Sequence, residues 1–166
     1  MQESLMNREG RAIARIDPSS PHGIYRYDYA SGAWVEINPA EGYLEPRADG
    51  LHVIYFDNAR CPACRVYDLY WFPFVSLMGQ MYDNANFYVV LCEWFARNCG
   101  SEKASRTFER YDVHASPTTM ILYVSGGKVV ATRRLEGVKR IDQLAEELER
   151  FLEEVRRGAP RPAGAP

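Results

Sequence analysis

Two cysteines, Cys61 and Cys64, are separated by two residues and follow an apolar run that ends at Phe56. Two thiols at this spacing can form a redox couple, supply half of a metal site, or be small buried residues without chemistry. The thiolate is the form of cysteine that attacks disulfides and binds metals. The surroundings of the two sulfur atoms therefore decide among these interpretations.

The residues on either side of the pair predict a strand followed by a helix. The run "LHVIYF", residues 51–56, is short and nearly all apolar, which is typical of a strand covered on both faces. The following helix is expected to begin at the cysteines and to bury Val66, Leu69 and Tyr70. Pro73 is expected to kink or split it. The cysteines then lie where the strand ends and the helix begins.

A cysteine at the N-terminus of a helix is placed to act as a nucleophile. Free backbone N–H groups and the positive end of the helix dipole stabilise a thiolate at Cys61, and cysteines so placed have a pKa of about 3.5–7.5 instead of about 8.5. Pro62 suits the first helical turn, and Arg60 and Arg65 are expected to favour the thiolate further. Cys64, one turn on, is expected to be buried and to resolve the mixed disulfide. This placement favours a redox couple over a metal site or inert packing.

The rest of the chain alternates strands and helices. Residues 86–95 predict a second buried strand, residues 101–112 a short amphipathic helix capped by Ser101, and residues 118–137 two strands around a "GG" turn. The last helix carries one apolar stripe, formed by Ile141, Leu144, Leu148, Phe151, Leu152 and Val155. The order from residue 51 is strand, helix, strand, helix, strand, strand, helix, which predicts an α/β sandwich with a mixed sheet.

The residues before this domain predict an extension. Period-2 patterning on both sides of "ASG", residues 30–32, predicts a β-hairpin. The expected divisions are an N-terminal segment (1–21) that is poorly ordered or holds a short helix around residues 6–16, a β-hairpin extension and linker (22–46), the α/β domain (47–157) and a disordered tail (158–166).

Residues 51–155 resemble the thioredoxin-fold family. "RCPACR", residues 60–65, is similar to the active-site motif of thioredoxins, glutaredoxins and disulfide oxidoreductases. "YDVHASPTTMILYVSGGKVVATRRLEG", residues 111–137, resembles the stretch in which that family carries Pro-Thr, a strand, a Gly-containing turn and another strand. The resemblance implies a thioredoxin-like three-layer sandwich in which Pro117 is cis and lies beside the cysteines, with Ser116 presenting its backbone to a substrate. Only about 5–6% of X–Pro bonds are cis.

The chain departs from the family at three positions. Arg60 replaces the tryptophan that precedes the first cysteine, Tyr55 stands where the family has a buried Asp that moves protons, and Pro73 is displaced within the first helix. Glu93 is the nearest carboxylate that could replace the missing Asp, with a surface position as the alternative. His114 is either a proton donor near the site or a solvent-facing loop residue. Thiol–disulfide exchange remains the expected activity, with its direction and substrate range open.

Six residues separate the other two cysteines, Cys92 and Cys99. They can form a structural disulfide, which needs a Cα–Cα distance of about 4.4–6.8 Å, or remain two free thiols. They can also act as a second redox pair that relays electrons to Cys61 and Cys64. A zinc site built from all four cysteines is a further alternative, although zinc-binding cysteines are usually separated by about two to four residues.

The composition is that of a soluble globular protein, with 46% hydrophobic and 25% charged residues. A net charge of −2, with basic residues scattered along the chain, gives no case for nucleic-acid binding. No apolar window approaches the ~18–20 residues of a membrane span, and the N-terminus has no signal-peptide core, so we expect a cytoplasmic protein without membrane contact. An oxidised second cysteine pair, together with few Asn and Gln residues, would point to a thermophile.

The predicted function is therefore thiol–disulfide exchange with disulfide-containing or dithiol protein substrates. The reaction needs no metal or organic cofactor, and we expect a monomer that exchanges electrons with an enzyme such as one of the thioredoxin-reductase type. Two rivals come from other classes: a non-catalytic thioredoxin-fold binding module, and a structural zinc-binding protein that uses the four cysteines.

Overall fold

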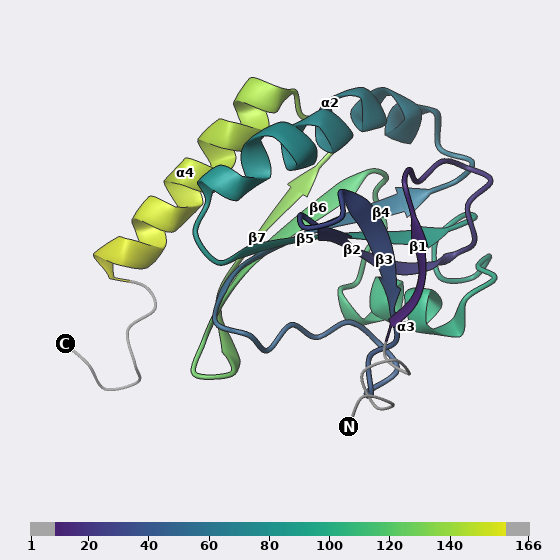
Figure 1. Cartoon of the computed structure of the whole chain (residues 1–166), viewed down its shortest axis with the longest axis horizontal. Coiled ribbons are helices and arrows are strands. Elements are labelled where there is room, and N and C mark those ends of the chain that lie inside the picture. Colours follow the sequence, from purple (N-terminus) through teal and green to yellow (C-terminus); the bar gives the residue numbers. More distant parts are fainter. Residues whose placement is uncertain (1–8, 159–166) are drawn as a thin grey trace.

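A computed structural model of the chain describes residues 9–158, so the first eight residues and the predicted tail beyond Gly158 lie outside the described part. Seven strands form one mixed sheet in the order β1-β3-β2-β5-β4-β6-β7. The elements are β1 (Glu9–Ile13), β2 (Gly23–Asp28), β3 (Ala33–Ile37), β4 (Gly50–Asn58), α2 (Pro62–Met78), the 3-10 turn η1 (Gly79–Met81), β5 (Ala85–Cys92), α3 (Glu102–Arg110), β6 (Thr118–Ser125), β7 (Lys128–Glu136) and α4 (Ile141–Arg157). Helices α2 and α4 cover one face of the sheet and α3 covers the other (Figure 1). The predicted α/β three-layer sandwich is confirmed.

Strand β4 lies inside the sheet, parallel to β5 and antiparallel to β6, and all nine of its residues are buried. Side chains alternate between the two faces of a strand. Val53 and Tyr55 therefore pack in the core under α2 and α4, whereas Ile54 and Phe56 pack in the core on the α3 side. Asp57 follows the same alternation and points toward α2.

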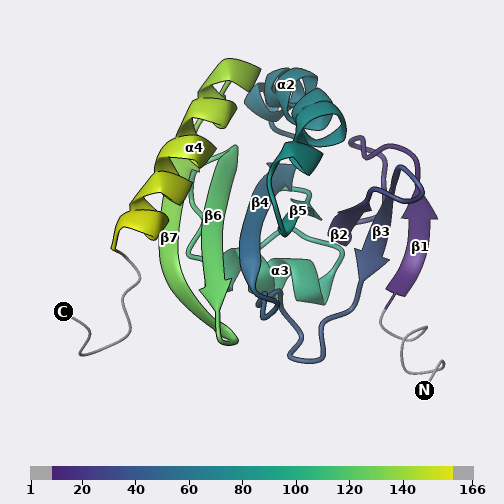
Figure 2. The ribbon, with the colours of Figure 1, turned by 60° about the vertical axis from the view of Figure 1, so that its left-hand side comes forward.

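The three N-terminal strands extend the sheet. β2 pairs with β5, β3 pairs with β2, and β1 pairs with β3 at the outer edge, all antiparallel (Figure 2). The prediction of a short helix around residues 6–16 is wrong, because residues 9–13 form β1. A short isolated helix is marginal in water, whereas the free edge of β3 offers hydrogen-bond partners to an extended segment.

Helix α2 buries a different face from the one predicted. Val66 and Leu69 are 46% and 69% exposed. The buried residues are Cys64, Tyr67, Trp71, Phe74 and Val75. The exposed face and the buried face of this helix both carry apolar residues, so the spacing of apolar residues does not show which face packs against the sheet. Pro73 does not split the helix, because it lies on the half-exposed side, where water can bond the carbonyl that its missing N–H leaves free.

The end of α2 packs tightly on the N-terminal strands. The Tyr29 hydroxyl donates a hydrogen bond to the Val75 carbonyl (2.5 Å), and a Cβ added at Gly79 would lie 1.9 Å from that hydroxyl oxygen. Gly79→Ala is expected to lower the free energy of unfolding by about 1–3 kcal/mol, as over-packed core substitutions do. In a Tyr29→Phe background the cost should be smaller, because the clashing oxygen is gone. Urea denaturation of the single and double variants measures both costs, and equal costs would rule out this contact as the cause.

Candidate active site

Cys61 lies at the junction between β4 and α2. It is the N-cap residue of α2, and Pro62 is the first residue of the helix. The backbone N–H of Cys64 donates a hydrogen bond to the Cys61 sulfur, 3.0 Å away. A donor aimed at the sulfur from a helix N-terminus stabilises negative charge on it.

The Cys61 sulfur is more enclosed than a position at a helix N-terminus implies. Cys61 is 3% exposed and Cys64 is 0% exposed. Both belong to the core cluster under α2, against which Ala59 and Ala63 also pack. Of the two cysteines, only Cys61 has exposed surface, so it is the one that a reagent from solvent can contact.

The loop before β6 contacts the cysteine pair through Ser116. The peptide bond between Ser116 and Pro117 is cis. Ser116 Oγ lies 3.1 Å from Cys64 Sγ, across 52 positions of the sequence. The side-chain amide of Asn58 donates to the same oxygen (2.9 Å), so the hydroxyl hydrogen of Ser116 is free to be donated to the Cys64 sulfur.

A group of charges that includes the buried Asp57 and the half-buried Arg65 and Asp68 lies near Cys64. The Arg65 guanidinium donates to Asp57 (2.6 Å) and to Asp68 (3.0 Å), and the Tyr55 hydroxyl also donates to Asp68 (2.8 Å). Asp57 is 1% exposed. Arg65, which was expected to support the Cys61 thiolate, instead directs its guanidinium to these two carboxylates, because buried anions need a counter-charge.

Burial raises the pKa values of both Asp57 and Cys64. It raises the pKa of Asp57 to about 7; the nearby Asp68 acts in the same direction, and Arg65 opposes both. Burial also raises the pKa of the Cys64 thiol, and the charge of Asp57 raises it further. The site therefore combines a carboxyl that exchanges its proton near neutral pH with a thiol that needs a base to lose its own.

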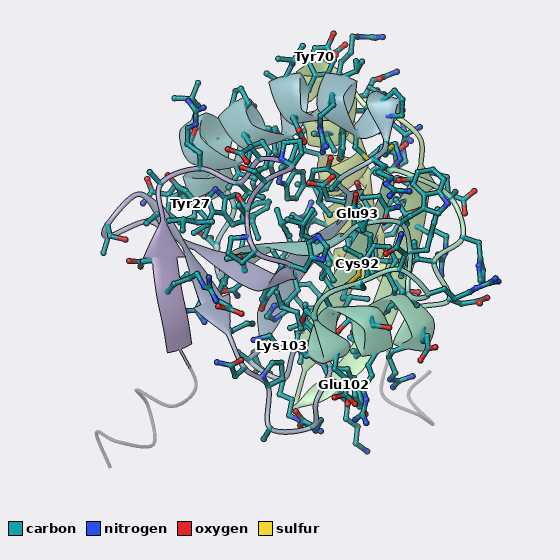
Figure 3. All side chains as sticks on the ribbon, turned by 90° about the vertical axis from the view of Figure 1, so that its right-hand side faces the viewer. Tyr27, Tyr70, Cys92, Glu93, Glu102 and Lys103 are labelled. Atoms are coloured by element: carbon teal, nitrogen blue, oxygen red, sulfur yellow. A yellow bond between two sulfur atoms is a disulfide. The ribbon has the colours of Figure 1, made fainter. Side chains whose placement is uncertain are left out.

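The second cysteine pair forms a disulfide. Cys92 and Cys99 are bonded, with their Cα atoms 4.6 Å apart. In Figure 3 Cys92 lies level with the sheet, between α2 and α3. Two sulfurs bonded to each other are not thiolate ligands, so the zinc site built from all four cysteines is wrong. Over residues 9–158, no three His, Cys, Asp or Glu side chains are grouped so that they could hold a metal, and no helix has the length and apolarity to cross a membrane.

Comparisons with known proteins identify the fold. By sequence, the chain matches no family model and no curated protein. By structure, it is similar to thioredoxin from Aeropyrum pernix, with a TM-score of 0.53 and 14% identity over 80% of this chain and 97% of that one. The chain has a thioredoxin fold. It also matches thioredoxin O2 from Arabidopsis thaliana in the oxidized state (TM-score 0.44, 22% identity, 62% of this chain and 76% of that one). A further match is mitochondrial thioredoxin 3 from Saccharomyces cerevisiae in the oxidized form (TM-score 0.42, 17% identity, 63% of this chain and 81% of that one).

The family resemblance locates a buried acid at position 55, where this chain has a tyrosine. In this thioredoxin fold the buried acid is Asp57, two residues further along β4. Asp57 follows the apolar run of β4 directly, and a charged residue at the end of a buried strand was the signal in the sequence that could have identified it. Glu93, the carboxylate chosen from the sequence, instead pairs near the surface with Arg60 (2.9 Å) and His22 (3.4 Å). Arg60 was expected to support the Cys61 thiolate, but its guanidinium, like that of Arg65, is directed to a carboxylate.

Asn58 is a second residue of the thioredoxin-fold site that was not selected from the sequence. Its amide oxygen accepts the backbone N–H of Phe95 (2.6 Å), and its amide nitrogen donates to Ser116 Oγ. It therefore joins the loop after β5 to the cis peptide. His114, by contrast, is exposed and pairs with Asp112 (2.7 Å), which favours the loop interpretation.

The raised pKa of Asp57 makes the stability of the fold depend on pH. The unfolded chain has the ordinary Asp pKa of 3.8, so Asp57 favours folding fully below that pH and loses its contribution as the pH rises through about 7. Over this window we expect the free energy of unfolding to fall by up to about 1.4 kcal/mol per pH unit because of Asp57. Asp57→Asn should flatten the slope. Chemical denaturation at a series of pH values measures it, and an unchanged slope would contradict the raised pKa.

Proposed function

We propose that the protein is a thiol–disulfide oxidoreductase that exchanges dithiol and disulfide with protein substrates through Cys61 and Cys64. One observation carries the proposal: the Cys61 sulfur caps the N-terminus of α2, where it accepts the N–H of Cys64, and a buried second thiol follows one turn later. This arrangement suits a nucleophile and a resolving thiol, because the attacking group has to be a thiolate and the second group has to wait for the mixed disulfide.

In the first step the Cys61 thiolate attacks one sulfur of the substrate disulfide. A bond forms between Cys61 and that sulfur, the substrate S–S bond breaks, and the departing substrate thiolate takes up a proton. In the second step Cys64 loses its proton and attacks the Cys61 sulfur. The Cys61–Cys64 disulfide forms and the second substrate thiol leaves, so the substrate is reduced by two electrons and the protein is oxidised by two. The reverse sequence makes disulfides.

Asp57 is the proposed base of the second step. Burial raises the pKa of Cys64, so this thiol needs an acceptor for its proton. Asp57 has a pKa of about 7, which suits a base at neutral pH, and its charge raises the pKa of Cys64. Ser116 supports the same step, because its hydroxyl can donate to the Cys64 sulfur as negative charge develops there.

The proposed function also includes a place for the substrate polypeptide and a partner for electron exchange. A polypeptide segment beside Ser116 and the cis Pro117 would carry its disulfide toward Cys61. The reaction as proposed takes place in the cytoplasm and uses no metal or organic cofactor. The protein would exchange electrons with an enzyme of the thioredoxin-reductase type.

Turnover of a protein disulfide tests this function. With insulin as the substrate and a small dithiol as the reductant, the rate of insulin reduction should rise in proportion to the protein concentration, with a chelator present. Protein alkylated at Cys61 provides the matched control and should be inactive. A rate no higher than that of the dithiol alone would instead favour the non-catalytic binding module.

A further inference from the structure

Asn58 is hydrogen-bonded to three separate segments around the cysteine pair. It is the last residue of β4 and is 0% exposed. Its backbone carbonyl accepts the N–H of Cys61 (3.1 Å). Its side chain accepts the N–H of Phe95 (2.6 Å) and donates to Ser116 Oγ (2.9 Å). One buried residue therefore joins the start of α2 to two loops that are distant from it in the sequence.

The Phe95 N–H fixes which way the Asn58 amide faces. A backbone N–H can bond only to the amide oxygen, so the NH2 group of Asn58 has to face Ser116. A reversed amide would set two donors against each other at Phe95. The loop that carries Phe95 is itself closed by the Cys92–Cys99 disulfide, which holds this N–H in place. The amide therefore has one orientation.

This orientation determines how Ser116 can bond to Cys64. The Ser116 oxygen accepts from Asn58, so its hydroxyl hydrogen is not used by that side chain. Cys64 Sγ lies 3.1 Å from the same oxygen. Once Cys64 has lost its proton it can only accept, so Ser116 has to be the donor between the two. The three hydrogen bonds then run in one direction toward the sulfur, and bonds aligned in this way strengthen one another.

Cys64 needs such donors in order to ionise. Burial raises the pKa of its thiol, and the charge of Asp57 raises it further. Hydrogen bonds from the Asn58 backbone and from Ser116 act in the opposite direction. Asn58 thus favours the thiolate directly through its backbone and indirectly through the hydroxyl that its side chain orients.

We propose that Asn58 is a positioning residue for the release step: its amide keeps the Ser116 hydroxyl directed at Cys64 while that sulfur becomes a thiolate. The inference rests on the proposed function and adds to it a residue whose side chain acts only through Ser116. A group that accepts at the position of the Asn58 NH2 would capture the Ser116 hydrogen and leave the sulfur without this donor.

Asn58→Asp tests this role with little change of shape. The carboxylate still accepts the Phe95 N–H, but its second oxygen accepts the Ser116 hydroxyl instead of donating to it. In single-turnover rapid-quench kinetics at neutral pH, release of the mixed disulfide should be about tenfold or more slower, as for the loss of a hydrogen bond to a charged group. Formation of the mixed disulfide should change little, because the attack by Cys61 does not use Ser116.

Asn58→Ala separates positioning from support of the fold. Alanine removes both side-chain bonds and leaves a void, so a purely structural role predicts slower release than in Asn58→Asp. Positioning predicts the opposite order, because alanine leaves the Ser116 hydrogen free whereas the carboxylate captures it. The rise of the release rate through about pH 7, which belongs to Asp57, should remain in Asn58→Ala.

Ser116→Ala completes the test, because it removes the hydroxyl through which Asn58 is proposed to act. It should slow release by a factor similar to that of Asn58→Asp, and the two substitutions together should be little slower than Ser116→Ala alone. A full effect of Asn58→Asp in the Ser116→Ala background overturns the inference, since the substitution would then act through its charge or through the structure. If Asn58→Asp does not fold, Asn58→Ala with and without Ser116→Ala provides the same comparison.

Failure of the proposed function has a different signature. If no mixed disulfide forms on Cys61, the function fails and the inference fails with it. If the mixed disulfide forms and is released at the same rate in the unmodified protein and in both Asn58 variants, the function stands and the inference is overturned. Slower release in Asn58→Ala than in Asn58→Asp overturns the inference as well.

Discussion

Cys64→Ser should leave the protein covalently bound to its disulfide substrate through Cys61. The variant keeps the attacking sulfur at the N-terminus of α2 but lacks the thiol that releases it. The mixed disulfide therefore forms and persists, and turnover falls to the uncatalysed rate. Mass spectrometry of the intact protein should show one substrate equivalent per chain, and peptide mapping should locate it on Cys61.

Cys61→Ser is the matched control for this capture. It retains the buried Cys64, which has no exposed surface and a raised pKa, so we expect neither turnover nor a captured substrate. Capture on Cys64 in this variant would reverse the assigned roles. Capture on Cys92 or Cys99 in either variant would show that the second pair, not the first, is the reactive one.

Asp57→Asn should slow the release of the mixed disulfide by about 100-fold at neutral pH, since a positioned base typically contributes about 10²–10⁴-fold. The formation of the mixed disulfide should change little, because Asp57 acts on Cys64. Rapid-quench kinetics with a single equivalent of substrate separates the two steps.

The pH profile of the release step identifies Asp57 as a base. In the unmodified protein the rate should rise as the pH increases through about 7, because the carboxylate is the form that accepts the proton. Asp57→Asn should lose that rise and recover part of its deficit only at high pH, where the thiol ionises unaided. Asp68→Asn provides the matched control, because it removes the other carboxylate bonded to Arg65 and keeps Asp57. Equal rates in the two variants would mean that Asp57 only maintains the structure.

The sequence predicts much of this fold where the signals are local. The run 51–56, Pro62 after Cys61 and the apolar stripe of residues 141–155 depend on neighbours within the same element. The face that α2 buries could not be predicted, because both of its stripes are apolar and the choice depends on contacts with the sheet. β1 was missed for a similar reason, since its partner, β3, is distant in the chain.

The residues of the candidate site also fall into those that could be predicted from the sequence and those that could not. The cysteine motif could be located from residue types and spacing, and Pro117 from the resemblance to the thioredoxin-fold family. The position of the buried acid could not be taken from the family, because a shift of two residues keeps a side chain on the same face of a strand. Asp57 therefore faces α2 just as Tyr55 does, and its counter-charge, Arg65, comes from the first turns of that helix. Only the assembled strand and helix show that Asp57 is buried near Cys64 and that the half-buried Arg65 reaches it.

The central claim is that Cys61 and Cys64 form a reversible redox couple. Equilibrating the protein in thiol–disulfide buffers of graded potential, followed by acid quenching, alkylation and peptide mass mapping, measures this directly. We expect a Cys61–Cys64 disulfide whose fraction changes from none to complete with a midpoint between about −270 and −120 mV, the range of known redox proteins of this kind. If Cys61 and Cys64 are alkylated as independent thiols at every potential, with no bond between them, the proposed chemistry is contradicted.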